Sequence, residues 1–145
     1  MLLDSTFLHD LVREDTAAVA TLGELIEDET PVTISPLTVY AVGIGLRGDA
    51  AGLRERFRGV VDDLEVAPLG VQQAERALAI RHRLLDDGER IGAIDVLLAG
   101  TAATLADPRV LTPDILSRLK SWAFSSNLCN VEEFERVDAI DVEPY

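Results

Sequence analysis

The chain contains very little cysteine or lysine and has no long apolar run, and these shortages exclude several classes of protein. Cys129 is the single cysteine among 145 residues, which excludes an internal disulfide framework and a cysteine-rich zinc site. No apolar stretch reaches the roughly 18 residues of a membrane-spanning helix. The start of the chain, Met1–Asp4, lacks the basic segment of a secretory signal. We therefore expect a single cytoplasmic domain.

Basic residues are scarce as well. The chain has 13 Lys and Arg against 26 Asp and Glu, a net charge of −13, and Lys120 is the only lysine. High acidity with almost no lysine resembles halophilic proteins, in which dense salt screens self-repulsion; an ordinary acidic protein is the alternative. Either way, a broad basic face for nucleic acid is absent, so any chemistry on nucleic acid must use a local site.

Short apolar segments alternate with stretches of helical periodicity. Strands are expected at residues 1–3, 31–34, 64–69, 109–112 and 140–143. Helices are expected at 7–12, 16–29, from 35 onward, and at 49–61, 71–85 and 94–105. This alternation predicts an α/β protein with a mainly parallel sheet.

Local patterns refine two of these helices. Ser5 or Thr6 is expected to cap the first helix, and Ser35 followed by Pro36 predicts a capped start of the third. The apolar residues expected on the inner face of the helix at 71–85 are Ala74, Ala77, Leu78 and Leu85.

One stretch differs in composition from the rest. The only Lys (Lys120), the only Trp (Trp122) and the only Cys lie within ten residues, and the only two asparagines, Asn127 and Asn130, lie beside them. We interpret residues 113–129 as an inserted or separately diverged segment within one domain of residues 1–145.

Three acids occupy positions where ligands bind in parallel sheets. Asp4 follows the first strand, Asp114 follows the fourth, and Asp95 opens an apolar helix. Ligands of open parallel sheets bind beyond the carboxyl ends of the strands. Carboxylates converging there repel each other unless a hard cation such as Mg²⁺ or Mn²⁺ binds them, and such an ion suits phosphodiester hydrolysis. The alternative is that each acid only caps the helix that follows it.

Four segments together resemble the PIN-domain ribonucleases of the VapC toxin type. They are Leu2–Leu8, Ser35–Tyr40, Ile94–Ala102 and Val110–Asp114. The resemblance implies a three-layer α/β/α sandwich and a Mg²⁺- or Mn²⁺-dependent endoribonuclease acting on RNA. It also implies a small antitoxin partner and a homodimer. Asp4 and Asp95 match the first and third acidic positions of the family.

The sequence departs from the family pattern at two places. Ala41 stands where the family has a metal-site Glu, before Val42 and Gly43, so we expect weak activity or none. At the fourth acidic position Asp114 fits the spacing from Asp95, whereas Asn130 fits the segment that follows. Asp114 is favoured and Asn130 is the lower-ranked alternative.

Two other functions remain open from the sequence. One is a PIN-like binding module that is catalytically silent because of Ala41. The other is a dinucleotide site, because Gly43, Gly45 and Gly48 fit the Gly-x-Gly-x-x-Gly pattern; that site would require a strand before the glycines and a helix after them.

Overall fold

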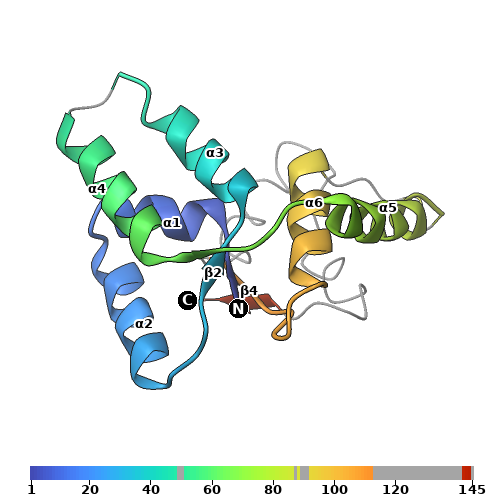
Figure 1. The fold of residues 1–145 in the computed structure, drawn as a ribbon, viewed down its shortest axis with the longest axis horizontal. Coiled ribbons are helices and arrows are strands. Elements are labelled where there is room, and N and C mark those ends of the chain that lie inside the picture. The colour runs from blue at the N-terminus through green and yellow to red at the C-terminus, as the bar shows by residue number, and fades with distance from the viewer. Residues whose placement is uncertain (49–50, 87, 89–91, 113–141, 145) are drawn as a thin grey trace.

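A computed structural model describes residues 1–48, 51–86, 88, 92–112 and 142–144. A five-stranded parallel sheet forms its centre, in the order β3-β2-β1-β4-β5 (Figure 1). The strands are β1 (Leu2–Leu3), β2 (Thr33–Ile34), β3 (Glu65–Val66), β4 (Val110–Thr112) and β5 (Val142–Pro144). The expected α/β class with a parallel sheet is therefore confirmed, although β1, β2 and β3 are only two residues long.

Six helices are described, and each connects or flanks the strands. They are α1 (Ser5–Val12), α2 (Thr16–Glu27), α3 (Pro36–Gly45), α4 (Ala51–Asp63), α5 (Val71–Asp86) and α6 (Ala93–Ala102). None of the helices in the described ranges combines the length and apolarity needed to cross a bilayer. The segment expected to be inserted, residues 113–129, lies outside the described residues.

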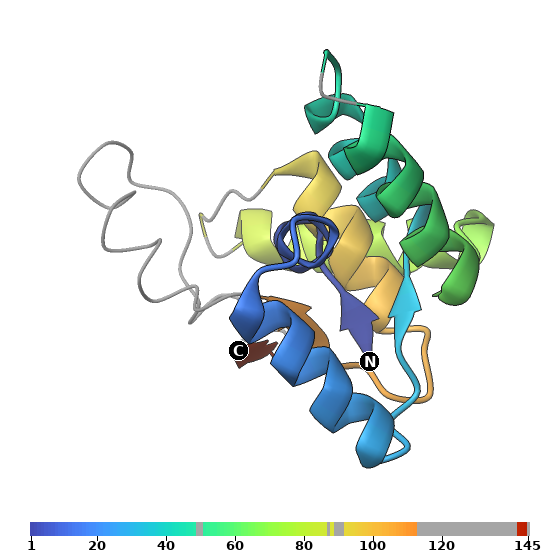
Figure 2. The ribbon, with the colours of Figure 1, turned by 90° about the vertical axis from the view of Figure 1, so that its left-hand side faces the viewer.

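The two faces of the sheet are covered by different helices. Successive side chains of a strand point to opposite faces, so Leu2 and Val110 pack with α5 and α6, whereas Leu3 and Leu111 pack with α1 and α2. Figure 2 shows α1 and α2 in front of the strands and α6 behind them. This arrangement is the three-layer α/β/α sandwich that the family resemblance implies.

Side-chain caps determine where two helices begin. The expected cap at Ser35 is confirmed: its Oγ accepts a hydrogen bond from the Leu37 amide at 3.1 Å, and Pro36 opens α3. The expected cap of α1 at Ser5 or Thr6 was wrong. Asp4 is the capping residue, because it keeps an extended backbone and its Oδ1 accepts the Phe7 amide at 2.8 Å.

The inner face of α5 also differs from the expectation. Leu78 and Leu85 are 53% and 48% exposed, and Ala74 is exposed too. The buried residues of α5 are Gln73, Ala77, Ile80 and Leu84. A glutamine can occupy the inner face because its polar atoms are satisfied: Oε1 accepts the Gly70 amide at 2.9 Å, and Nε2 donates to Thr104 Oγ1 at 3.1 Å.

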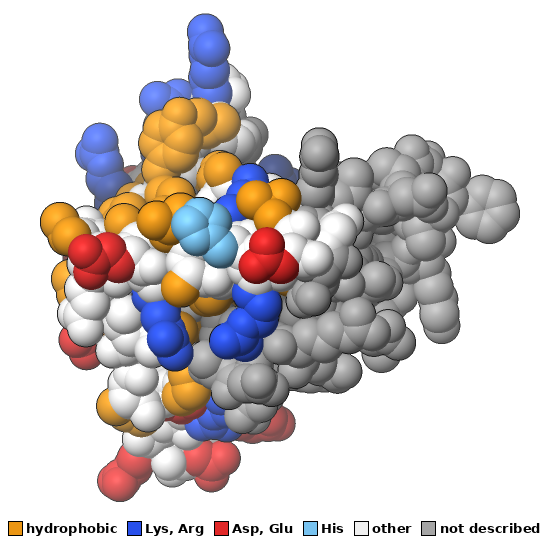
Figure 3. Space-filling view, turned by 90° about the vertical axis from the view of Figure 1, so that its right-hand side faces the viewer, with side chains coloured by type: hydrophobic (Ala, Val, Ile, Leu, Met, Phe, Trp, Pro, Cys, Tyr) orange, Lys and Arg blue, Asp and Glu red, His pale blue; other side chains and the backbone are white. Residues whose placement is uncertain are grey.

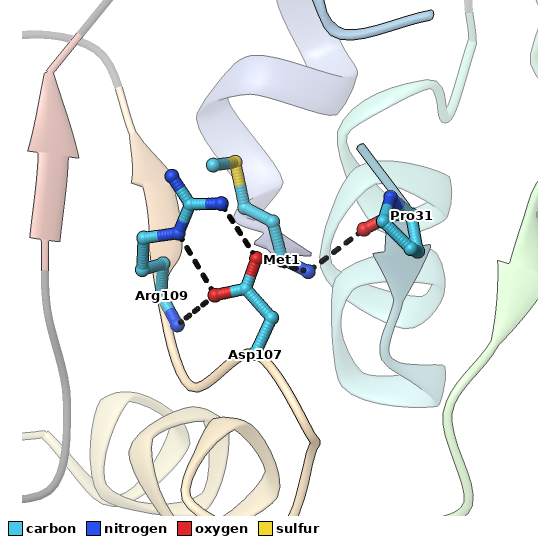
Figure 4. A network of polar contacts seen from close by, with 4 residues as sticks. All are labelled: Met1, Pro31, Asp107 and Arg109. Carbon is cyan, nitrogen blue, oxygen red and sulfur yellow. Dashed lines mark hydrogen bonds and ion pairs between the residues drawn. The ribbon is translucent and has the colours of Figure 1, made fainter. Parts of the chain in front are cut away.

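Charged groups join the starts of three strands at the amino edge of the sheet (Figure 4). The Met1 ammonium donates to the Pro31 carbonyl at 2.8 Å and lies 3.4 Å from Asp107 Oδ2. Arg109 donates to both oxygens of Asp107, from Nε at 2.8 Å and from Nη2 at 2.7 Å. Hydrogen bonds from Arg109 and the nearby positive charges lower the pKa of Asp107 from 3.8 to about 2.

The close contact between α5 and α6 predicts that Gly100→Ala destabilises the fold. A Cβ at Gly100 would lie 2.6 Å from both the Cβ and the backbone nitrogen of Ala77 and 2.7 Å from the Gln73 carbonyl oxygen. Because backbone cannot rotate away, the helices must separate, which costs about 1–3 kcal/mol. Urea unfolding measures this loss. Gly59→Ala, with no atom within 4 Å of its Cβ, is the control and should lose nothing; equal stability of the two variants would contradict the prediction.

The amino-edge ion pairs predict a defined loss of stability in acid. Because the pKa of Asp107 is depressed to about 2, its stabilising contribution is complete above about pH 4 and disappears as the pH falls to about 2. Asp107→Asn should lower the urea midpoint at pH 7 and flatten its decline between pH 4 and 2. Asp62→Asn, an exposed acid on α4, should leave that decline unchanged. A decline as steep in Asp107→Asn as in the parent would refute the assignment.

Candidate functional site

Asp4 lies where β1 ends, and both of its carboxylate oxygens have a described partner. Oδ1 accepts the Phe7 amide and caps α1. Oδ2 accepts a hydrogen bond from the Thr112 hydroxyl at 2.6 Å, and the Asp4 amide donates to the Leu111 carbonyl at 3.1 Å. The reading of Asp4 as a cap is therefore confirmed, but the cap engages one oxygen, and the other is turned toward the end of β4.

Thr112 is a site residue that the sequence reasoning missed. It is the last residue of β4 and is buried. Its hydroxyl is separated by 108 positions from the carboxylate it contacts, and only the parallel pairing of β1 with β4 brings them together. The available signal was the position of a hydroxyl residue at the carboxyl end of a strand, next to the strand that carries Asp4.

Thr38 fixes α3 against the same part of the sheet. Its side chain is fully buried, and its hydroxyl donates to the Leu3 carbonyl at 3.3 Å. Ala41 lies one helical turn further along α3 and is half-buried. A methyl group can neither ligate a cation nor accept a proton, so position 41 contributes no chemistry to this edge.

Asp95 lies in the first turn of α6, three residues after Gly92, the N-cap residue of this helix. Asp95 is exposed, because the apolar side of α6 turns Val96, Leu98 and Ala99 inward instead. Surrounding protein atoms still desolvate its carboxyl and raise its pKa above 3.8. No cation forms an ion pair with Asp95 within the described part of the chain.

The topology brings Asp4 and Asp95 to the same edge of the sheet. The helix α6 runs back against the direction of the strands, so its first turn lies at the edge where β1 ends (Figure 1). Asp114 and Asn130, the alternatives for the fourth acidic position, lie outside the described residues. Among the described residues, no three His, Cys, Asp or Glu side chains come together as a metal-binding group.

The donors described at this edge are suitable for a hard divalent cation. Two carboxylates and one hydroxyl supply oxygen atoms, which Mg²⁺ and Mn²⁺ prefer, and Mg²⁺ usually keeps several waters and binds through only one or two carboxylates. Asp4 Oδ2 is held in place by a hydroxyl, and Asp95 retains its exposure to solvent. The donors described at this edge are therefore of the chemical type that such an ion takes.

The dinucleotide interpretation was wrong. It requires a strand before Gly43, but residues 36–45 form helix α3. Gly43 and Gly45 therefore lie inside a helix, and Gly48 adopts φ +84° in the turn that follows. Because no strand leads into these glycines, their spacing does not build a phosphate-binding turn.

Known proteins resemble this chain in sequence and in fold. The PIN domain family model matches residues 1–118. Ribonuclease VapC19 of Mycobacterium tuberculosis is 31% identical over 118 residues, which cover 79% of this chain and 88% of that protein. The fold of this chain also resembles that of a chain in the crystal structure of VapBC2 from Rickettsia felis, which was solved bound to a DNA fragment from the VapBC2 promoter.

The match to the Rickettsia felis VapBC2 structure has a TM-score of 0.76 at 16% identity and covers 99% of this chain and 97% of the matched chain. DNA-bound VapBC from Salmonella typhimurium gives a TM-score of 0.72 at 20% identity, over 99% and 96% of the two chains. Identities this low show the fold alone, whereas the family model and the Mycobacterium relative show the family. The chain belongs to the PIN-domain family and, within it, to the VapC-type ribonucleases.

Proposed function

We propose that the chain is the toxin of a toxin–antitoxin pair, a Mg²⁺- or Mn²⁺-dependent endoribonuclease whose own activity is impaired by Ala41. The observation that carries the proposal is the Asp4 carboxylate, oriented by Thr112 at 2.6 Å, at the sheet edge where α6 begins with Asp95. The relationship to Ribonuclease VapC19 supports RNA as the substrate class.

In this proposal Asp4 and Asp95 hold the divalent ion, with Asp114 or, as the alternative, Asn130 completing the site. A bound ion would supply activation of a water molecule and neutralisation of charge that develops on the phosphate. The hydroxyl of Thr112 keeps one oxygen of Asp4 directed at this edge, and the Phe7 amide holds the other. These two hydrogen bonds thereby fix the orientation of the carboxylate that we propose as a metal ligand.

Ala41 favours a second candidate, a PIN-like module that binds a partner without cleaving RNA. The half-buried methyl of Ala41 replaces the carboxylate that the family places at this position. A toxin impaired at one residue and a binding module share one fold, so only restoration of the missing carboxylate separates them.

The solved toxin–antitoxin assemblies of similar fold support an antitoxin partner. The neighbours from Rickettsia felis and Salmonella typhimurium are VapBC assemblies. We infer that this chain likewise binds a small antitoxin protein, which suppresses whatever cleavage the toxin retains.

We infer also that the chain forms a homodimer, and exposed residues of α5 support this. Val71, Leu78 and Leu85 recur every seven residues and are 75%, 53% and 48% exposed. Figure 3 faces this side of the molecule and shows apolar side chains at the surface among acidic and basic ones. If two α5 helices pair antiparallel about Leu78, Val71 meets Leu85 and Glu75 meets Arg81. The exposed stripe on α5 that consists of Val71, Leu78 and Leu85 is therefore self-complementary, as a twofold interface requires.

Restoring the carboxylate at position 41 is expected to restore cleavage. Ala41→Glu should raise cleavage of synthetic single-stranded RNA in Mn²⁺ by about 100-fold or more, the range that one acid–base group contributes. Ala41→Gln has nearly the same shape without the charge and should show no gain. Adding Asp4→Asn or Asp95→Asn to Ala41→Glu should abolish the gain. A folded Ala41→Glu protein no more active than Ala41→Gln would leave the binding module as the correct function.

The proposed dimer is tested by changing the stripe on α5. Leu78→Glu buries two charges at the twofold axis and should give a monomer in light scattering after size-exclusion chromatography. Ile26→Glu, at a position 63% exposed on α2, is the control and should keep the parent mass. Glu75→Arg should weaken the dimer, and the added change Arg81→Glu should restore it. A Leu78→Glu protein with the parent mass would contradict this interface.

A further inference from the structure

Gly92 immediately precedes α6, yet nothing about its backbone calls for glycine. Its φ of −59° and ψ of 150° lie in a region open to every residue. The position is the N-cap of the helix, where Ser, Thr, Asp or Asn would add a side-chain hydrogen bond, and Gly92 provides none. Glycine is accepted at an N-cap without such a bond, so neither the backbone nor the cap singles out glycine here, and the space around the residue is what distinguishes it.

The space around Gly92 identifies that constraint. A Cβ built on Gly92 would lie 2.5 Å from Oδ2 of Asp95 and 3.5 Å from its Cγ. Among the described residues beyond its chain neighbours, these are the only contacts within 4 Å, and both are with one carboxyl group. The Asp95 carboxylate is thus folded back over the α-carbon of Gly92, in the place that any other residue would fill with its own Cβ.

A comparison of Gly92 with Gly100 shows why a substitution at Gly92 should alter the orientation of Asp95 rather than the fold. At Gly100 the added Cβ meets backbone atoms of α5, and the helices themselves must move. At Gly92 it meets the end of a flexible, exposed side chain, and rotation of that side chain relieves the contact. Substitution of Gly92 should therefore turn the Asp95 carboxylate away and leave the fold intact.

We propose that Gly92 is a positioning residue for Asp95: by lacking a Cβ it lets the carboxylate occupy the orientation in which it ligates a divalent ion. This inference rests on the proposed metal-dependent function. It assigns to Gly92 a role exerted through Asp95, the one residue of the described part of the chain, chain neighbours aside, that the missing Cβ would contact.

Two substitutions of Gly92 separate positioning from helix capping. Gly92→Ala adds a Cβ and removes capping ability, whereas Gly92→Ser adds the same Cβ and a good cap. Both should weaken Mn²⁺ binding to the full chain, measured by calorimetry, about 10-fold or more, as changes to groups that orient a ligand do. If only Gly92→Ala weakens binding, capping is the cause and the inference is overturned.

A double-mutant cycle tests whether the effect passes through Asp95. Asp95→Asn should itself weaken Mn²⁺ binding, and adding Gly92→Ser to it should change affinity by less than about 2-fold, because the two changes act on one group. Full additivity of the two losses would overturn the inference. Gly23→Ala on α2, with no atom within 4 Å of its Cβ, should bind Mn²⁺ as the parent does.

The position of the Asp95 carboxyl can also be observed without any metal. The ¹³C signal of its Cγ and its side-chain couplings should change in both Gly92→Ala and Gly92→Ser and stay unchanged in Gly23→Ala, at equal unfolding midpoints for Gly92→Ser and the parent. If neither the parent nor Asp95→Asn binds Mn²⁺, the proposed metal site fails, yet this signal still decides the inference. An Asp95 signal unmoved by both substitutions overturns it.

Discussion

The pairing of β1 between β2 and β4 is the constraint on which the rest of the structure depends. Leu2 and Leu3 are its only two residues, and each is fully buried on a different face of the sheet. A shift of the register by one residue would move each leucine to the other face and bring Met1 or Asp4 into a position that a leucine now fills. The same pairing sets Asp4 beside the end of β4, so the bond from Thr112 to Asp4 at 2.6 Å exists only in this register.

Much of the fold could be predicted because local chemistry and tertiary packing agree. The Ser35–Pro36 start of α3 and the short apolar strands followed from patterns a few residues long. The inner face of α5 could not, since Gln73 is polar and its burial depends on partners at Gly70 and Thr104. Apolar periodicity assigned Leu78 and Leu85 to the core, whereas a satisfied glutamine occupies it and leaves those leucines at the surface.

The candidate site shows the same division between local and distant information. Asp4 and Asp95 could be named as candidates from the sequence, Asp4 because it follows a buried strand and Asp95 because it opens an apolar helix. Their shared edge followed from the topology of parallel sheets. The partner of Asp4 could not be selected, because Thr112 is joined to it only through the pairing of distant strands. The space that Asp95 occupies over Gly92 was equally invisible, since a glycine in a sequence does not reveal what fills the place of its side chain.

The two edges of the sheet hold their carboxylates by different means. At the amino edge Asp107 is paired with Arg109 and the Met1 ammonium, so its charge is neutralised and serves stability. At the carboxyl edge a backbone amide and a hydroxyl, both neutral donors, orient the carboxylate of Asp4. A chain of net charge −13 repels a polyanion such as RNA at long range. In the proposed function, a divalent cation bound at the carboxyl edge would draw a phosphate to a protein that otherwise repels it.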